Sequence, residues 1–394
     1  MLNRNLKNIY VYTFLYSFLL LNPIWVLYLL HIGYDLFLIT ILDVVYFLTI
    51  VLTSIPMGRI TDSIGRRNAL FISSIVTGVG IILFGLLTSF IGIAFSYILW
   101  GVGGAINSSA LESISYEYST GHNLKYLEVF GIINFISAIS LATASILGGI
   151  LGSLEGLKIV IVVTGITVLL SSLYTVNIRE RKRVNPVRRG SHDLMNYVRD
   201  RRVMSLIILR IAFVLNFNMM LIFKQPYYKE MGIATAIIGV IFFVDVFLRG
   251  VSSLFTQRLS FIAKNKFFSM LFFTSFTFFT IYIPGLLQNG ISILFLILNS
   301  VIFGFYTNIL SEEVNVQIPS QVRATVLSVI LLVSSLLTAM AEPFLGYSAT
   351  VIGLKTTMLI FSFIFLAVAT FGIFIYIQGK DMEKFRLSIG RARP

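Results

Sequence analysis

The sequence predicts an all-α polytopic membrane protein with twelve transmembrane helices, arranged as two pseudo-symmetric six-helix bundles. Composition is the first reason: 57% of the residues are hydrophobic, 12% are charged and the mean hydropathy is +0.91. A chain with so little polar surface cannot cover a water-soluble globule. The second reason is a series of apolar runs, each near the roughly 20 residues that a helix needs to cross a bilayer. The third is a similarity between the two halves of the chain.

The apolar runs place the expected helices and the domain boundaries. They cover residues 9–30, 36–57, 69–88, 91–111, 126–150 and 157–177, and then 203–225, 234–256, 267–287, 291–311, 324–346 and 356–377. The first six predict an N-terminal bundle over 1–178 and the second six a C-terminal bundle over 203–379. A cytoplasmic basic linker, 179–202, joins the bundles, and a cytoplasmic basic tail, 380–394, follows. The first run is too long for a secretory signal, so we expect a retained first helix.

Short matches relate the two halves of the sequence. Gly156-Leu157-Lys158 precedes the sixth run, and Gly353-Leu354-Lys355 precedes the twelfth. Gly104 near the end of the fourth run corresponds in the same way to Gly304 in the tenth. Together with two sets of six spans, these matches predict a duplicated architecture with an axis along the membrane normal.

The basic residues predict the orientation in the membrane. The formal net charge is +13, and most of the 30 lysines and arginines fall in segments on the same side as the N-terminus. Lys158, Lys224, Lys229 and Lys355 are assigned to the opposite side. By the positive-inside rule, both termini should be cytoplasmic, and we expect the plasma membrane. The charge then needs no nucleic-acid partner, and the linker is expected to be a solvated loop, with binding of anionic membrane lipid as the alternative.

Several classes of function are disfavoured by what the sequence lacks. It has no cysteine, which excludes disulfides, thiolate metal sites and cysteine nucleophiles. Its three histidines, His31, His122 and His192, fall in loops without partners at a spacing suited to catalysis or metal binding. No G-x-x-x-x-G-K-[ST] motif occurs. We therefore expect no enzyme activity, no metal and no cofactor, and we expect a monomer.

A charged loop punctuated by glycines separates the second and third runs. It reads Gly58-Arg-Ile-Thr-Asp62-Ser-Ile-Gly65-Arg66-Arg67. Gly58 is expected to let the backbone leave the second helix, Asp62 to face a helix N-terminus, and Gly65 to allow the turn that directs both arginines at lipid headgroups. The pattern resembles G-x-[LI]-x-D-x-x-G-[RK]-[RK], the signature loop of the major facilitator superfamily (MFS) of secondary transporters.

Other segments carry the same resemblance. The fourth run contains Trp100-Gly-Val-Gly-Gly104 and leads to an acidic end with Glu112 and Glu117, similar to helix 4 of the superfamily. The eleventh helix opens Arg323-Ala-Thr-Val-Leu-Ser328, a recurrent opening in the family. One departure is Tyr97, at the position where drug/proton antiporters of the family usually carry an arginine. Drug antiport of that type is therefore disfavoured.

The resemblance implies two groups of functional residues. In a conformational latch, Asp62 would dock near Arg323 at the start of the eleventh helix, while Arg66 or Arg67 reaches Glu112 or Glu117. The helices that line the central cavity in the superfamily supply these substrate-cavity candidates here: Asn22, Trp100, Asn107, Asn216, Asn218, Asn299, Tyr306 and Asn308. Such a lining suits a polar neutral or zwitterionic small-molecule substrate better than a strongly anionic one. Each asparagine could instead form a hydrogen bond between helices.

Charged residues within the spans are further candidates, because they are costly in lipid. Asp245 and Arg249 are spaced to share one helix face, and could form a structural pair or handle substrate or protons. Asp43 has no basic neighbour within one turn, and burial favours its neutral form, so it is a candidate proton site. The alternative is that Asp43 accepts hydrogen bonds from the eleventh helix, from Ser334, Ser335 or Thr338.

Taken together, the residues and the resemblance predict a secondary active transporter. It would move a small solute by alternating access between the two bundles, with the proton as the candidate coupling ion. The alternative is a non-transporting sensor or scaffold with the transporter fold.

Overall fold

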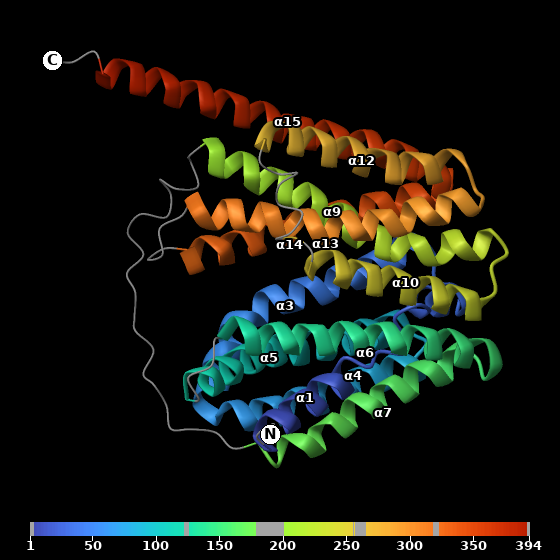
Figure 1. Ribbon diagram of the computed structural model, residues 1–394. Helices are drawn as coiled ribbons and strands as arrows, with labels where there is room; N and C mark the ends of the chain where they lie inside the picture. The colour runs from blue at the N-terminus through green and yellow to red at the C-terminus, as the bar shows by residue number, and fades with distance from the viewer. Residues whose placement is uncertain are drawn as a thin grey trace. The chain divides into compact units, whose positions relative to one another are not determined.

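The structure, a computed structural model, describes residues 4–121, 126–178, 201–254, 256, 265–317 and 323–391. In these ranges the regular elements are helices (Figure 1). Ten of the described helices are long and apolar enough to cross a membrane. Most of the predicted basic linker, together with His122 and His192, lies outside the described residues.

The helices follow the predicted apolar runs. In the first half they are α1 (Arg4–Tyr16), α2 (Trp25–His31), α3 (Leu36–Ile64), α4 (Arg66–Leu86), α5 (Phe90–Gly121), α6 (Tyr126–Leu154) and α7 (Leu157–Thr175). In the second half they are α9 (Arg201–Glu230), α10 (Thr235–Leu254), α12 (Lys266–Leu286), α13 (Gly290–Gln317), α14 (Arg323–Ile352) and α15 (Leu354–Arg391). Each run matches one helix, except the first, which matches two. The prediction of an all-α protein with many membrane spans is confirmed.

The first span is interrupted, so the prediction of one helix over 9–30 was wrong. α1 ends at Tyr16 and α2 begins at Trp25, and the chain between them, residues 17–24, turns and is not helical. Pro23 contributes to the break, because proline lacks an N–H and its ring clashes with the carbonyl four residues earlier in a helix. The break leaves backbone polar groups in need of partners within the protein.

The loop after the second span is much shorter than the sequence predicts. α3 continues through Gly58 and Asp62 to Ile64, and α4 starts at Arg66. Gly58 therefore does not end the helix, because a single glycine costs a helix only about 1 kcal/mol and the polar residues beyond it continue the same hydrogen bonds. Gly65 alone makes the turn, at φ 88°, a conformation that a residue without a Cβ adopts readily.

The matched segments of the two halves have matching structures. Gly156 and Gly353, which precede α7 and α15, have φ values of 91° and 87°. Helix packing corresponds as well: α4 packs against α5 and α7, and α12 packs against α13 and α15. These correspondences support the duplication that the sequence predicts.

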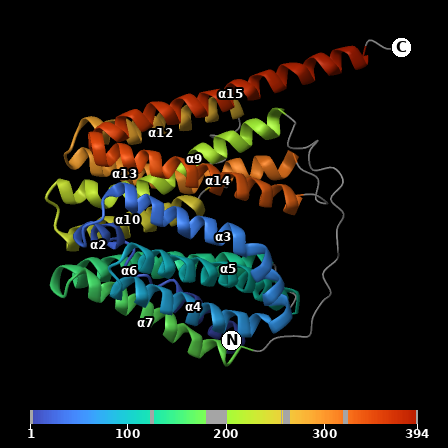
Figure 2. The ribbon, with the colours of Figure 1, turned by 180° about the vertical axis from the view of Figure 1, so that it is seen from behind.

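The chain divides into two compact units that do not follow the border between the sequence halves. The first comprises 1–185, 224–247 and 339–350, and the second comprises 186–223, 248–338 and 351–394. The first unit therefore includes parts of α9, α10 and α14. Its helices α4 to α7 run side by side (Figures 1 and 2). The bundles over 1–178 and 203–379 remain a sequence-based prediction.

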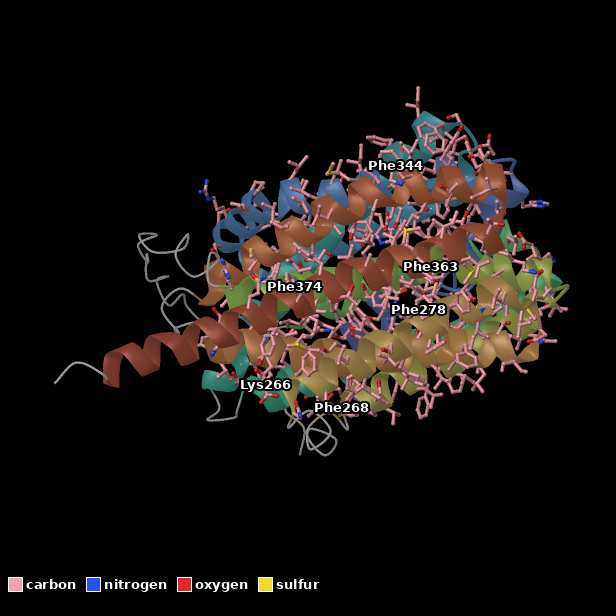
Figure 3. The ribbon with its side chains drawn as sticks, turned by 90° about the horizontal axis from the view of Figure 1, so that it is seen from above. Lys266, Phe268, Phe278, Phe344, Phe363 and Phe374 are labelled. Atoms are coloured by element: carbon pink, nitrogen blue, oxygen red, sulfur yellow. The ribbon has the colours of Figure 1, made fainter. Side chains whose placement is uncertain are left out.

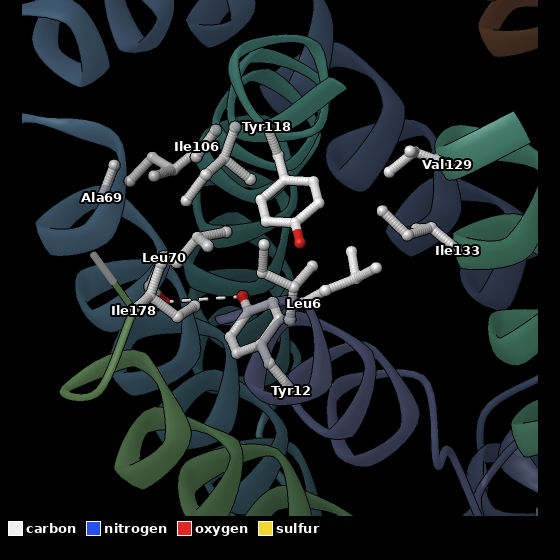
Figure 4. Packing of buried hydrophobic residues seen from close by; sticks show 12 residues of the cluster. Leu6, Tyr12, Ala69, Leu70, Ile106, Tyr118, Val129, Ile133 and Ile178 are labelled. Carbon is white, nitrogen blue, oxygen red and sulfur yellow. Dashed lines mark hydrogen bonds between the residues drawn. The ribbon is translucent and has the colours of Figure 1, made fainter. Parts of the chain in front are cut away.

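Each unit has a buried core of its own. In the first unit, apolar side chains from α1, α4, α5 and α6 gather around Tyr12, whose hydroxyl oxygen lies 3.5 Å from the Leu70 carbonyl oxygen (Figure 4). In the second unit, the Tyr306 ring of α13 lies between two phenylalanines. Its centroid is 4.6 Å from that of Phe273 and 4.8 Å from that of Phe213.

Large apolar side chains also lie on the outside of each unit. Phe344 of α14 is 74% exposed and Phe374 of α15 is 54% exposed. Figure 3 shows both among the many side chains that project from the helices. So much exposed apolar surface would drive association in water, whereas in a bilayer it faces acyl chains. The exposed residues therefore agree with a membrane-spanning protein.

Within the first unit, helices from the two sequence halves meet. α6 meets α10 at Gly149 and Gly239, where a Cβ added to Gly149 would lie 2.6 Å from the Gly239 Cα. α3 meets α14, where the Phe37 N–H donates to Thr350 Oγ1 at 3.3 Å. We call these two contacts, α6 with α10 and α3 with α14, the junction. It lies on the side that the basic residues predict to be extracellular.

Gly149→Ala should weaken the junction, because the new Cβ would overlap the backbone of Gly239. We expect a loss of about 1–3 kcal/mol, seen as a lower melting temperature of the purified protein. The matched control is Gly131→Ala in the same helix, where an added Cβ would meet no atom within 4 Å. The control should melt no lower than the parent, since alanine favours helix by about 1 kcal/mol over glycine. Equal melting of the two variants would contradict the close approach.

Candidate functional site

The signature loop is tied to the end of α5 by an ion pair. Arg66, the first residue of α4, pairs with Glu117, and its other terminal nitrogen lies 3.9 Å from Asp62 Oδ1. The Arg66 and Glu117 side chains are mostly buried. A guanidinium–carboxylate pair is stronger where water is scarce. The structure thus brings together two of the residues that the resemblance assigned to the latch.

The other latch candidates are not held in this pair. The Asp62 side chain is 59% exposed, and Arg67 and Glu112 are also exposed. The side chain of Arg323 lies outside the described part of the chain. The contact between Asp62 and Arg323, and the role of the group as a latch, therefore stay predictions.

The second unit contains a corresponding ion pair that was not foreseen from the sequence. Lys266 opens α12 as Arg66 opens α4, and its ammonium pairs with the carboxylate of Glu313 near the end of α13. The available signal was the position of this acid, near the end of the helix that corresponds to α5. In both halves, therefore, a salt bridge connects the start of the third span (α4 or α12) to the end of the fourth (α5 or α13).

Side chains from α7 and α9 satisfy the backbone at the interrupted first span. The Leu21 N–H donates to Thr164 Oγ1 at 3.1 Å. Gln225 of α9 forms two bonds: its Oε1 accepts from the Val26 N–H at 2.9 Å, and its Nε2 donates to the Asn22 carbonyl at 3.0 Å. Gln225 is completely buried, so these bonds replace water. The break is therefore a fixed feature with polar partners of its own.

Two of the cavity asparagines lie in the first unit, and each is bonded to another helix. Asn22 Nδ2 donates to Ser145 Oγ of α6 at 3.1 Å. Asn107 Oδ1 accepts from the Tyr12 hydroxyl at 2.7 Å. Both asparagines keep part of their surface exposed. Their amides are therefore oriented by neighbours and remain open to a further contact.

Trp100 lies among aromatic rings. Its centroid is 5.4 Å from that of Tyr46 and 5.9 Å from that of Tyr97, and it is partly exposed. Tyr97 in turn packs edge-on against Phe84 at 5.3 Å. Aromatic pairs at these distances fix one another's orientation. The indole is therefore held in place by α3 and α5.

The cavity candidates of the second unit are in more varied surroundings. Asn216 donates to Asn299 Oδ1 at 3.3 Å, and Asn299 donates to Thr280 Oγ1 at 2.8 Å. Both asparagines are 1% exposed, so here the interhelical alternative fits the geometry. Tyr306 is also buried, whereas Asn218 is partly exposed.

Asn308 is the last of these candidates, and it is exposed. Its Nδ2 donates to Ser253 Oγ of α10 at 2.7 Å. A bond of this length to a neighbouring helix fixes the amide, as at Asn216.

Asp43 faces an acid that was not identified from the sequence. Its carboxyl group interacts with that of Glu342 in α14. Glu342 is completely buried, and neither of its carboxyl oxygens has a partner at normal hydrogen-bond geometry among the described residues. The signal that was missed is a charged residue inside an apolar run, directly before Pro343. The predicted hydrogen bonds to Asp43 from Ser334, Ser335 and Thr338 stay a prediction.

Asp245 of α10 forms an ion pair with Lys224 of α9. The distance from Lys224 Nζ to Asp245 Oδ1 is 2.6 Å, and the side chains are 1% and 3% exposed. The assignment of Lys224 to an outer segment was therefore wrong: it is buried within a helix, where its charge is tolerable because a carboxylate meets it. Arg249 places its guanidinium 4.8 Å over the ring of Phe217, in the range of a cation–π contact.

The chain is similar to known proteins in sequence and in fold. A model of the Major Facilitator Superfamily matches residues 9–341. A search of curated proteins gives no match. Among solved structures, a bacterial homologue of the human lysosomal transporter Spinster, inward-facing and occupied, is 16% identical, with a TM-score of 0.74 over 95% of this chain and 96% of its own.

Two further structures are similar over nearly the whole chain. The nucleoside transporter NupG is 12% identical, with a TM-score of 0.76, covering 95% of this chain and 98% of its own. PepTSo, a POT family transporter, is 11% identical, with a TM-score of 0.76, covering 96% and 99%. At these identities the likeness is one of fold.

Neutralising one partner of the buried ion pair should destabilise the protein. Lys224→Met or Asp245→Asn alone would leave the other charge buried, and we expect a loss of about 3–5 kcal/mol. The double variant Lys224→Met/Asp245→Leu should recover most of it, because no charge is left unpaired. Thermal melting after purification measures this. Lys229→Met, at the exposed end of the same helix, is the control and should change little. A double variant no more stable than the single variants would contradict a structural role.

Proposed function

Because the chain belongs to the Major Facilitator Superfamily, a family of membrane solute transporters, we propose that it is a secondary active transporter working by alternating access. Such a protein draws on a solute or ion gradient and carries out no chemical step on its substrate. We further propose that it works as a monomer in the plasma membrane, surrounded by lipid, with both termini in the cytoplasm.

The junction is the observation that carries this proposal. Alternating access requires that the two sequence halves close together on one side of the membrane and later separate there. At Gly149 and Gly239 the contact is backbone against backbone. Small residues let helices approach closely, and separating them leaves no large side chain unpacked. Such a contact suits repeated opening and closing.

We propose a polar neutral or zwitterionic solute. Asn22, Asn107 and Trp100 are oriented by their neighbours and remain partly exposed, and they offer amide and indole groups without net charge. Similar folds are those of a nucleoside transporter and of POT family transporters in complex with a conjugated peptide and with 5-aminolevulinic acid. Nucleosides and short peptides are therefore the first solutes to test.

Counterflow in proteoliposomes tests the proposal. Protein reconstituted with unlabelled nucleoside or peptide inside should accumulate the labelled solute, since exchange needs only alternating access. Liposomes that contain the same unlabelled solute but no protein are the control. A sensor or scaffold with this fold would bind solute without exchanging it, so binding without counterflow would overturn the proposal.

Asp43→Asn should abolish solute accumulation driven by a pH gradient while counterflow survives. The reason is that Asp43 lies within a span and has no basic partner among the described residues, and we propose that it carries the coupling proton. Parallel gradient-driven uptake and counterflow measurements distinguish coupling from folding. Gradient-driven accumulation that persists in the variant would contradict proton coupling at Asp43, and loss of both activities would favour a structural role.

Asp62→Asn should reduce transport by about 10-fold, if Asp62 helps to latch one of the two states. The Arg66–Glu117 pair should survive the change, so the protein should fold and express as before. Initial rates at equal expression measure the effect. Glu155→Gln, an exposed acid in the turn before α7, is the matched control. Unchanged rates for Asp62→Asn would remove it from the latch.

A further inference from the structure

The carboxyl groups of Asp43 and Glu342 lie where α3 and α14 meet, and Glu342 has no role assigned so far. Asp43 is in α3 and Glu342 is in α14, the two helices that also meet at Phe37 and Thr350. Thr40 of α3 lies directly against Gly346 of α14, between these two contacts. The carboxyl groups therefore face each other only because the two helices are together.

Two ionised carboxylates cannot remain face to face in such a place. Glu342 is completely buried, and Asp43 is partly buried. In the part of the chain that the structure describes, the other titratable groups within electrostatic reach of Asp43 are the hydroxyls of Tyr46 in α3 and Tyr97 in α5. Among the described residues, no lysine, arginine or histidine acts on either acid. Without a cation, repulsion and loss of water both favour a carboxyl group that keeps its proton.

Tyr97 adds a second buried polar group to this cluster. Its hydroxyl is buried and forms no hydrogen bond with a described residue, yet it is within electrostatic reach of the Asp43 carboxyl. The Tyr97 ring is fixed by Trp100 and Phe84, so it cannot simply turn towards water. A buried hydroxyl near an acid to which it is not bonded is suited to stabilise the carboxylate left when a proton departs.

We propose that Asp43 and Glu342 together form a proton-binding site that is loaded when α3 and α14 are in contact and unloads when they separate. On separation, the O–H bond of a carboxyl group breaks, the proton passes to water and a carboxylate remains. Asp43, the more accessible acid, exchanges the proton, and Glu342 is its sheltered partner. This inference rests on the proposed transport function for its meaning, but the site itself can be tested without any solute.

Mass action gives the direction in which pH should change the contact between α3 and α14. A proton that binds the closed junction more tightly than the open one stabilises the closed junction. Acidic pH should therefore favour contact between α3 and α14, and alkaline pH should favour separation. Replacing both acids by their amides mimics the protonated pair, and the junction should then stay closed at every pH.

The experiment measures the distance across the junction directly. The chain has no cysteine, so spin labels can be attached at His31→Cys, the last residue of α2 just before α3, and at Ser348→Cys, in α14. In the labelled parent, the distance distribution should shift from short at mildly acidic pH to longer at mildly alkaline pH. Asp43→Asn/Glu342→Gln should abolish this shift and keep the short distance. Asp35→Asn, an exposed helix cap at the start of α3, is the control and should shift as the parent does.

Infrared spectroscopy provides a second readout that does not depend on movement. The carbonyl band of a protonated carboxyl group should be present in the parent and in Asp35→Asn, and absent from Asp43→Asn/Glu342→Gln. Replacing sodium and potassium by choline should change neither readout. Distances that do not respond to pH, a response retained by the double variant, or a response to the metal cation instead of pH would overturn the proposal. Failure of solute counterflow with the pH response intact would instead overturn the transport function alone.

Discussion

Inside a bilayer, every backbone N–H and C=O must find its partner within the protein, and the interrupted first span depends on this constraint. Residues 17–24 leave the helix, and Thr164 and Gln225 supply bonds that the helix would have made. Gly148 of α6 allows the Leu20 carbonyl to lie against it, where any larger residue would collide. α6, α7 and α9 are therefore positioned by the needs of a few unwound residues.

Features that depend on local sequence could be predicted. A membrane helix can be recognised from its length and apolarity, so eleven of the twelve runs each correspond to one helix, and the first corresponds to two. The glycines at 65, 156 and 353 adopt positive φ values at helix boundaries, as glycines placed between apolar runs are free to do. The pairing of Arg66 with Glu117 was accessible only through the resemblance to a family, because nothing in either segment alone selects the partner.

Features that depend on contacts between distant segments could not be predicted. Lys224 lies near the end of an apolar run, so the sequence alone predicts a residue at the membrane surface. Only the structure shows that it pairs with Asp245 on the next helix. Glu342 lies within an apolar run, and its neighbour Asp43 is on a helix from the other half of the chain. The break at residues 17–24 was signalled by Asn22 and Pro23, but a proline can kink a helix without unwinding it. Whether the helix unwinds depends on whether partners such as Gln225 are present to bond the freed backbone groups.

Gln225 has a consequence beyond satisfying the backbone. A single amide accepts from Val26 and donates to Asn22, so both bonds require one position and one rotation of α9 relative to the first span. A small turn or slide of this end of α9 would break both bonds together and leave four polar groups without these partners at the same moment: the Val26 N–H, the Asn22 carbonyl and both ends of the Gln225 amide. Partial displacement is therefore unfavourable. This contact should be either fully formed or fully broken, so it favours two discrete arrangements without stable intermediates.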